Sequence, residues 1–217
     1  MRFFIVRHGE TRWNTEGRFQ GQRDTELNER GVAQSNRVAE YLAEHGFDAV
    51  VSSPLKRAYF AAEKIAERCR VKTVEKIPAF TEINHGDWEG LLSSEVSARW
   101  PRLIEMWHSE PHTVIMPGEN GESLRSVQIR SAAAAAELAE RYSGDVCVTA
   151  HDAVIKTLVC HFLNAPLSSF WSFQIANCGL TIVEVIAGKP PRMSLMGDAH
   201  YLGERGKNFT LPEQKGL

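Results

Sequence analysis

The chain begins with an apolar run, Phe3-Phe4-Ile5-Val6, which Arg7 and His8 follow directly. Four consecutive apolar residues predict a strand that is buried on both faces, as in a parallel sheet covered by helices. In open α/β sheets, ligands bind at the carboxyl ends of the strands. This segment therefore indicates an anion site at the first strand end. A histidine hydrogen-bonded within the core is an equal alternative on this segment alone.

Two further segments repeat this order of strand, polar residue and helix. Residues 49–52 predict a second buried strand, and the Ser-Pro pair after it suits the cap and first residue of a helix, with Arg57 in the first turn. Residues 145–150 predict a third buried strand that ends at His151. The sequence thus places basic side chains or imidazoles beyond three strand ends.

These strand ends together indicate one site. They carry Arg7 with His8, then Arg57, and finally His151. The start of a helix directly after a strand also favours negative charge, because its free N–H groups and its dipole point at the ligand. Unrelated core residues would not be expected to repeat this placement. The sequence therefore favours a single shared anion site.

The remaining pattern completes an α/β chain of one domain, residues 1–217, since 217 residues with 43% hydrophobic content suit one large core. Residues 9–27 form a polar loop beside the predicted site, and residues 85–122 predict a cap of short helices and turns. Residues 199–217 predict a polar tail. The other predicted elements are helices over residues 29–44, 123–142 and 154–162 and strands over residues 71–74, 178–186 and 192–196.

Composition excludes several classes of function. The formal net charge is −2 without a basic block, which argues against a nucleic-acid partner. The sequence shows neither a secretory leader nor an apolar run that could span a membrane, so we expect a soluble cytoplasmic protein without a membrane partner. The four cysteines contain no CxxC pair, so neither a disulfide nor a metal site is indicated.

Four short motifs occur in the order found in a known family. They are Arg7-His8-Gly9-Glu10-Thr11 with Asn14, Arg18 and Gln20-Gly21, then Ser52-Ser53-Pro54-Leu55-Lys56-Arg57-Ala58, then Glu82 before Gly86-Asp87-Trp88-Glu89-Gly90, and finally His151. Together they resemble the histidine phosphatase superfamily, with its phosphoglycerate mutase-like fold, over residues 2 to about 186. The resemblance implies a three-layer α/β/α sandwich with a largely parallel central sheet, no metal or other cofactor, and a phosphohistidine intermediate.

The chemistry of the site residues agrees with this resemblance. His8 is the expected nucleophile, because a neutral imidazole can attack phosphorus in line and nearby cations disfavour its protonated form. Arg7, Arg57 and His151 are expected to bind the equatorial phosphoryl oxygens, and Asn14 to add a neutral hydrogen bond.

The resemblance assigns the proton donor to Glu82, which would later deprotonate the hydrolytic water. The cations of the site are expected to keep Glu82 ionised until a bound phosphate dianion raises its pKa. Asp152 is a competing acid, because the acid phosphatase branch uses an aspartate after the second histidine. We favour Glu82 from its Gly-Asp-Trp-Glu-Gly context and expect Asp152 to cap the following helix.

The expected substrate is a small phosphorylated metabolite. The shorter chain and the absence of the mutase lysine favour hydrolysis, and the chain resembles the metal-independent phosphoserine phosphatases within the family. Gln20 and Gly21 are implied as substrate-binding residues. His85 and His200, partly protonated, are expected to attract the carboxylate of L-phosphoserine.

Several alternatives stay open. An α-ribazole or broad-specificity phosphatase is the first rival to a phosphoserine phosphatase, and a phosphoglycerate mutase is the next. Outside catalysis, the chain would be an inactive phosphate-binding module. The oligomeric state is undetermined, with a homodimer as one candidate.

Overall fold

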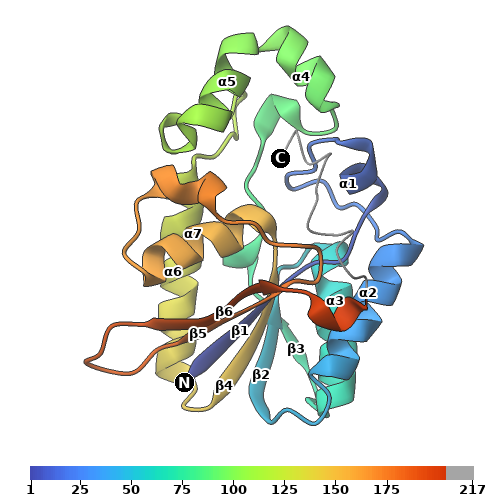
Figure 1. The fold of residues 1–217 in the computed structure, drawn as a ribbon, viewed down its shortest axis with the longest axis vertical. Coiled ribbons are helices and arrows are strands. Elements are labelled where there is room, and N and C mark those ends of the chain that lie inside the picture. The colour runs from blue at the N-terminus through green and yellow to red at the C-terminus, as the bar shows by residue number, and fades with distance from the viewer. Residues whose placement is uncertain (204–217) are drawn as a thin grey trace.

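The computed structural model describes residues 1–203 and holds a six-stranded sheet between layers of helices (Figure 1). The strands are β1 (Arg2–Arg7), β2 (Phe47–Ser52), β3 (Val74–Lys76), β4 (Asp145–Ala150), β5 (Leu180–Glu184) and β6 (Arg192–Asp198). Their order across the sheet is β3-β2-β4-β1-β5-β6. The first strand of the chain thus lies inside the sheet, where both of its faces are covered.

Four neighbouring strands form the parallel part of the sheet, because β1 pairs with β4, β4 with β2, and β2 with β3 in parallel register. β5 runs antiparallel to β1, and β6 runs antiparallel to β5. The chain enters β5 from the side where β1 ends, since the amide of Cys178 donates to the carbonyls of Arg7 and His8 at 3.0 and 3.2 Å. The expected α/β fold with a largely parallel sheet is confirmed, with two antiparallel strands at one edge.

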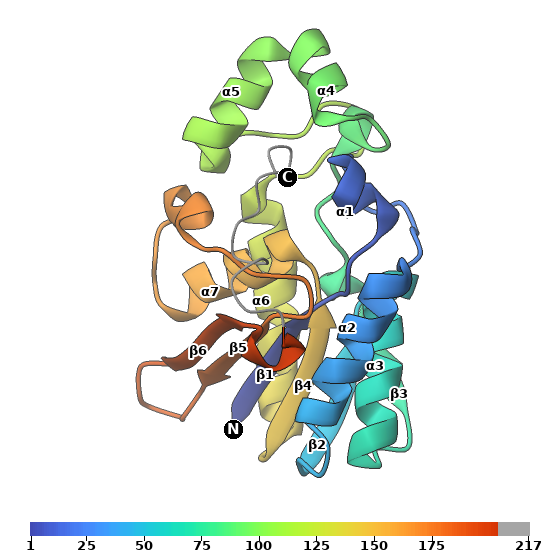
Figure 2. The ribbon, with the colours of Figure 1, turned by 45° about the vertical axis from the view of Figure 1, so that its right-hand side comes forward.

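Four helices form the outer layers. They are α2 (Glu29–Tyr41) and α3 (Lys56–Cys69) on one face, and α6 (Leu124–Arg141) and α7 (Asp152–Phe162) on the other (Figures 1 and 2). Alternate residues of β1 enter two different cores, because successive side chains of a strand point to opposite faces. Phe4 and Val6 pack in the cluster with α2 and α3, while Phe3 and Ile5 pack in the cluster with α6 and α7. The apolar run is therefore buried on both faces, as predicted.

Most of the shorter elements lie beyond the carboxyl ends of the parallel strands, while the turn at His200–Leu202 packs against the end of α2 (Figure 1). The short helices are α1 (Arg12–Glu16), α4 (Ser93–Arg99) and α5 (Pro101–Ser109), and the 3₁₀ turns are η1 (Pro78–Phe80), η2 (Gly86–Trp88), η3 (Pro111–Thr113), η4 (Leu167–Ser172) and η5 (His200–Leu202). The predicted cap segment 85–122 contains α4 and α5, which lie farthest from the sheet (Figure 2). The indole Nε1 of Trp171 donates to the carbonyl of Trp107 at 2.6 Å, which ties α5 to η4.

The structure corrects two predictions near the site. The predicted polar loop 9–27 contains α1, because Thr11 and Asn14 form a reciprocal capping box that starts a helical turn. The Ser-Pro pair does not cap α3, which begins at Lys56 after the cap residue Leu55. The hydroxyl of this serine is used by a histidine of the site instead, as described below.

Other predicted boundaries shift at the ends of elements. β3 lies later than the predicted 71–74, and β5 is shorter than the predicted 178–186. Of the predicted tail 199–217, residues 204–217 lie outside the described part of the chain. Within residues 1–203, none of the helices combines the length and apolar character needed to cross a bilayer.

Candidate active site

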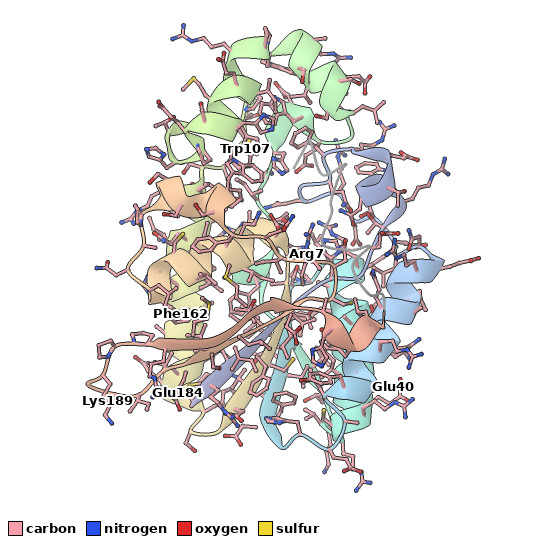
Figure 3. The ribbon with its side chains drawn as sticks, viewed as in Figure 1. Arg7, Glu40, Trp107, Phe162, Glu184 and Lys189 are labelled. Carbon is pink, nitrogen blue, oxygen red and sulfur yellow. The ribbon has the colours of Figure 1, made fainter. Side chains whose placement is uncertain are left out.

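The predicted residues of β1, α3 and β4 lie together at the carboxyl ends of the parallel strands. Arg7, His8, Arg57 and His151 are all buried, none more than 3% exposed. The amide of His8 donates to the carbonyl of Ala150 at 3.0 Å, which holds the ends of β1 and β4 side by side. Figure 3 places Arg7 between the sheet and the cap that carries Trp107.

The imidazole of His8 is held as one neutral tautomer. Its Nδ1 lies 2.6 Å from the carbonyl oxygen of Gly9, and since a carbonyl only accepts, Nδ1 carries the proton. Burial, followed by the charges of Arg57 and Arg7, holds the pKa of His8 well below its usual value. Nε2 therefore keeps a free electron pair at neutral pH, which is the state that a nucleophile needs.

A second neutral imidazole lies beside the first. The ring centres of His8 and His151 are 5.2 Å apart, and Nε2 of His151 lies 2.8 Å from Oγ of Ser53. Burial and then Arg57 hold the pKa of His151 well below its usual value. Its Nδ1 is buried and has no hydrogen-bond partner among the described residues. A buried polar atom without a partner inside a cationic site suits contact with an anion.

The guanidinium of Arg57 is anchored by backbone carbonyls. Nη1 donates to the carbonyl of Arg23 at 2.8 Å, and Nη2 donates to the carbonyl of Gly21 at 2.7 Å. Burial lowers the pKa of Arg57 to about 10, so the group stays charged at neutral pH. Gly21 has φ +51°, and a Cβ there would lie 2.0 Å from Oε1 of Glu89, so the turn that holds Arg57 requires glycine.

The guanidinium of Arg7 contacts one acceptor in the irregular segment before β5 and another on α7. Its Nη1 donates to the carbonyl of Ile175 at 2.5 Å and lies 3.3 Å from Oδ1 of Asp152. Oδ2 of Asp152 lies 2.7 Å from Nζ of Lys156. Burial alone would raise the pKa of Asp152, but Lys156 and Arg7 outweigh it and lower that pKa. Asp152 is therefore a carboxylate paired with two cations. The expectation that it caps its helix is wrong, because it is the first residue of α7, the cap residue is His151, and among the described residues no side chain caps this helix.

The pKa of the Glu82 carboxyl is raised, whereas that of Asp152 is lowered. Its carboxyl is buried and accepts one hydrogen bond, from the amide of Ile83 to Oε1 at 2.9 Å. Burial, and next the charge of Asp152, raise the pKa of Glu82 to about 7, although Arg57 and Arg7 oppose the shift. The expectation that the cations alone keep Glu82 ionised is wrong, because burial outweighs them. The carboxyl can hold a proton near neutrality without a bound phosphate.

Arg130 of α6 holds the segment that carries Glu82, and the sequence reasoning missed it. Its Nη1 donates to the carbonyls of Ala79 and Thr81 at 2.7 and 2.6 Å, and its Nη2 donates to the carbonyl of Glu82 at 3.1 Å. Its Nε forms an ion pair with Oε1 of Glu122 at 2.8 Å. Arg130 is one of several arginines of α6 and carries no local signal of this role.

Two predicted polar residues lie at the edge of the cluster. Oδ1 of Asn14 accepts from the amide of Thr11 at 3.0 Å, while its Nδ2 is buried without a hydrogen-bond partner in the described chain. Asn14 thus has a free donor, as a phosphate ligand would need. Oε1 of Gln20 accepts from the hydroxyls of Thr11 and Thr25, and Thr25 also lies 3.4 Å from Nη1 of Arg57. Gln20 is therefore linked to Arg57 through the hydroxyl of Thr25.

The two histidines expected to bind a carboxylate do not form a pair. His85 is buried against Phe19 and Trp107, and burial, then Arg57, lower its pKa to about 3. The expected partial protonation of His85 is therefore wrong. Nδ1 of His200 lies 2.5 Å from Oδ2 of Asp198, and its ring contacts Tyr41, the last residue of α2. The structure does not bring its imidazole to His85.

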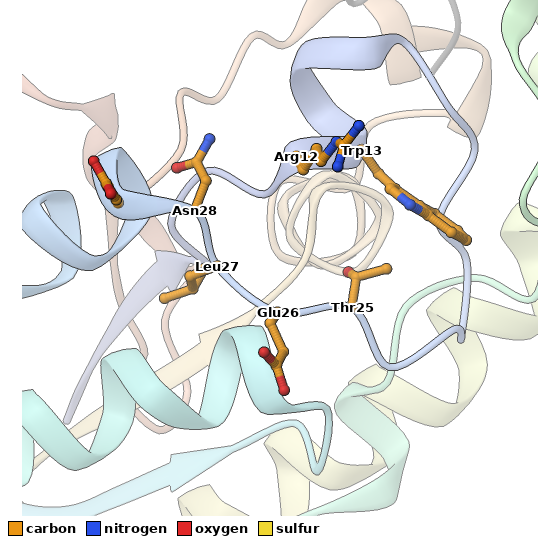
Figure 4. A pocket seen from close by; sticks show the side chains of 7 residues that line it. Arg12, Trp13, Thr25, Glu26, Leu27 and Asn28 are labelled. Atoms are coloured by element: carbon orange, nitrogen blue, oxygen red, sulfur yellow. The ribbon is translucent and has the colours of Figure 1, made fainter.

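A separate hollow of about 520 Å³ lies beside α1 (Figure 4). Its lining residues are Arg12, Trp13, Thr25, Glu26, Leu27, Asn28 and Glu29. Of the predicted site residues it contains none, so it is distinct from the cluster at the strand ends. Among residues 1–203, no group of three or more His, Cys, Asp or Glu side chains is arranged to hold a metal ion.

Two buried guanidinium groups and two neutral imidazoles at the ends of parallel strands, with a buried carboxyl nearby, define an α/β enzyme of phosphoryl transfer. Residues 3–198 match the family model of the histidine phosphatase superfamily (branch 1). The chain belongs to this superfamily and is a phosphoric monoester hydrolase.

Individual relatives agree with this assignment. The chain is 36% identical to phosphoserine phosphatase 1 of Hydrogenobacter thermophilus, over 85% of this chain and 87% of the relative. It is 33% identical to glucosyl-3-phosphoglycerate phosphatase of Mycobacterium tuberculosis, over 78% of each chain. The solved structure of YhfR from Bacillus stearothermophilus has a TM-score of 0.85 and 30% identity, covering 93% of this chain and 98% of that one.

Proposed function

We propose that this phosphatase hydrolyses a small phosphomonoester without a metal ion, through a phosphohistidine on His8. The main support for this proposal is the hydrogen bond from Nδ1 of His8 to the carbonyl of Gly9, which leaves Nε2 unprotonated beside Arg7 and Arg57. A fixed neutral tautomer among buried cations suits attack on phosphorus.

In the first step, Nε2 of His8 attacks phosphorus and the bond from phosphorus to the leaving oxygen breaks. Glu82 gives its proton to that oxygen, so the alcohol departs neutral and Glu82 becomes a carboxylate. In the second step, water attacks the phosphohistidine while Glu82 takes a proton from it. The N–P bond breaks, inorganic phosphate leaves, and both residues return to their starting states.

Throughout, the phosphoryl oxygens are bound by groups that carry positive charge or free donors. Arg7 and Arg57 supply charge, His151 and Asn14 supply hydrogen bonds, and all four are buried. Charge spread over the equatorial oxygens in the transition state is stabilised by such fixed donors, which need no reorganisation during the reaction.

We propose L-phosphoserine as the first substrate to test. The name of the relative from H. thermophilus supports it, while the relative from M. tuberculosis makes a glycosylated phosphoglycerate the rival. The carboxylate-binding histidine pair no longer supports this choice, because His85 is neutral and His200 lies elsewhere. An α-ribazole or broad-specificity activity stays an alternative.

The test measures kcat/KM for L-phosphoserine, glucosyl-3-phosphoglycerate, α-ribazole phosphate and p-nitrophenyl phosphate, with and without EDTA. We expect turnover that survives EDTA and is abolished by His8→Ala, and a preference for L-phosphoserine. Loss of turnover on chelation would refute the metal-free mechanism. Equal rates on all four esters would favour a broad-specificity phosphatase. Binding of phosphate without any turnover would identify a binding module, and isomerisation of 3-phosphoglycerate would identify a mutase.

A further inference from the structure

Asp152, the first residue of α7, lies between two cations in the wall of the site. Its two oxygens lie 3.3 Å from Nη1 of Arg7 and 2.7 Å from Nζ of Lys156, and the three side chains are between 1% and 9% exposed. Nζ of Lys156 also lies 4.8 and 4.7 Å from the ring centres of Phe170 and Trp171. Oδ2 of the carboxylate is thus held closely by Lys156, while Oδ1 forms an ion pair with Arg7 and accepts no hydrogen bond among the described residues.

A buried carboxylate is costly unless it is paired and well hydrogen-bonded. Here the two ion pairs and the N-terminus of α7 favour the charged form. The pairing also acts on Arg7, whose Nη1 is shared between Asp152 and the carbonyl of Ile175. Asp152 therefore restricts the orientation of the guanidinium of the last residue of β1, directly before His8.

The same carboxylate is part of the charge environment of Glu82. The charges that act on Glu82 are Asp152 on α7, Arg57 on α3 and Arg7 on β1, and only Asp152 among them is negative. Arg130 of α6 donates to the backbone carbonyl of Glu82. His85 is neutral, so it adds no charge at this point. Burial is the largest influence on the pKa of Glu82, and Asp152 adds to it the one negative charge among these three groups.

We propose that Asp152 is a positioning residue of this phosphatase: its carboxylate, paired with Lys156, orients the guanidinium of Arg7 and adds a negative charge to the surroundings of Glu82. The inference rests on the proposed function, in which Glu82 is the general acid. It assigns no proton transfer to Asp152, because Arg7 and Lys156 hold that group as the anion. Lys156 is a second counter-charge of this buried carboxylate, beside Arg7, which remains when Lys156 is replaced.

Two substitutions with opposite charge effects test the proposal. Asp152→Asn keeps the shape of the side chain and removes its charge, so the basic limb of the kcat/KM profile should shift toward acid by roughly half a pH unit or more. Lys156→Met removes a cation from the same pair, so the limb should shift toward alkaline pH. A loss of packing alone would not move the basic limb of the kcat/KM profile in opposite directions in the two variants. Rates are measured with L-phosphoserine and p-nitrophenyl phosphate.

A titration that needs no turnover separates this inference from the proposed function. In protein labelled with ¹³C at the glutamate carboxyl groups, the Glu82 signal is identified by its loss in Glu82→Gln. Its titration midpoint should fall in Asp152→Asn and rise in Lys156→Met, whether or not an ester is hydrolysed. Thermal melts followed by circular dichroism verify that each variant is folded.

Three outcomes would overturn the proposal. In the first, the titration midpoint of Glu82 is unchanged in both variants. In the second, it moves in the same direction in both variants. In the third, Asp152→Asn loses turnover of L-phosphoserine but keeps that of p-nitrophenyl phosphate, and the basic limb of its kcat/KM profile does not shift. The last result would assign the proton donor to Asp152 itself. Absence of wild-type turnover with the predicted midpoint shifts would refute the proposed function and leave the electrostatic role of Asp152 standing.

Discussion

The hydroxyl of Ser53 lies 2.8 Å from Nε2 of His151, which joins the ends of two neighbouring parallel strands. Ser53 follows β2 and His151 follows β4, and the pairing of Ser52 with Thr149 sets this distance through the register of the sheet. The same hydroxyl accepts the amide of Leu55 at 3.3 Å. One serine thus orients an imidazole of the site and the first turn of α3.

Ser53→Ala should therefore lower kcat/KM for p-nitrophenyl phosphate by about 10-fold, because a ring nitrogen of His151 loses its partner in a buried place, a loss of about 1–3 kcal/mol. Ser52→Ala is the matched control, since its hydroxyl bonds to the carbonyl of Ser53 and not to the imidazole. Steady-state rates and melting temperatures of both variants are compared. Equal rate losses in the two variants would contradict a specific role for Ser53.

Glu82→Gln should separate substrates by their leaving groups. Alkyl esters such as L-phosphoserine need a proton on the departing oxygen, so their kcat should fall by about 10²–10⁴-fold, while p-nitrophenyl phosphate should lose much less in its first step. Burst kinetics with p-nitrophenyl phosphate follow that first step directly. Glu119→Gln, on the exposed part of the cap, is the control. A uniform loss on both esters would argue against Glu82 as the acid.

The raised pKa of Glu82 predicts a pH dependence of both activity and stability. The acid is protonated below a pKa of about 7, so kcat/KM should decline above that pH. Between its unfolded pKa and about 7, the folded chain holds more protons at Glu82 than the unfolded chain, so the free energy of unfolding falls as the pH rises.

Glu82→Gln cannot ionise and escapes this loss, which is on the order of 3 kcal/mol once the pH exceeds 7. The variant should therefore gain melting temperature over the wild type between pH 5 and pH 8, by roughly 2–4 °C for each kcal/mol. Scanning calorimetry at several pH values measures the difference. A constant difference across this range would show that Glu82 titrates normally in the folded protein.

Arg130→Met should reduce both stability and acid catalysis. The substitution leaves the carbonyls of Ala79, Thr81 and Glu82 without this donor, which costs about 1–3 kcal/mol in the free energy of unfolding. Because the Glu82 segment loosens, kcat should fall more for L-phosphoserine than for p-nitrophenyl phosphate. Arg125→Met, which removes a contact with Gln128 on the same helix, is the control. Equal losses on the two esters would reduce Arg130 to a structural role.

The sequence predicts the parallel part of the fold and the grouping at its strand ends for one physical reason. The apolar runs that end at Arg7 and His151 are short, uninterrupted and typical of buried strands, and parallel strands present their carboxyl ends at one edge. The grouping of these side chains can therefore be predicted without predicting the conformation of any loop. The apolar pattern predicts that β5 and β6 are strands. It does not predict that they run antiparallel to the rest of the sheet.

The electrostatic states of the site residues follow from contacts that periodicity does not encode. His85 is neutral because Phe19 and Trp107, from distant parts of the chain, exclude water from it. The pKa of Glu82 rises to about 7 because burial outweighs the arginines near it. Arg130 looks like any arginine of an exposed helix until the carbonyls of the irregular segment before Glu82 are placed against it. These properties depend on the folded environment.

The position of β1 has a consequence for the synthesis of the protein on the ribosome. The proposed nucleophile His8 directly follows this strand, which is hydrogen-bonded between β4 and β5, two strands that are translated far later. The amide of Cys178 then closes over the carbonyls of Arg7 and His8. A nascent chain in which β5 has not yet been made therefore lacks one neighbour of β1, and the site at the end of this strand cannot be complete before β5 has been translated.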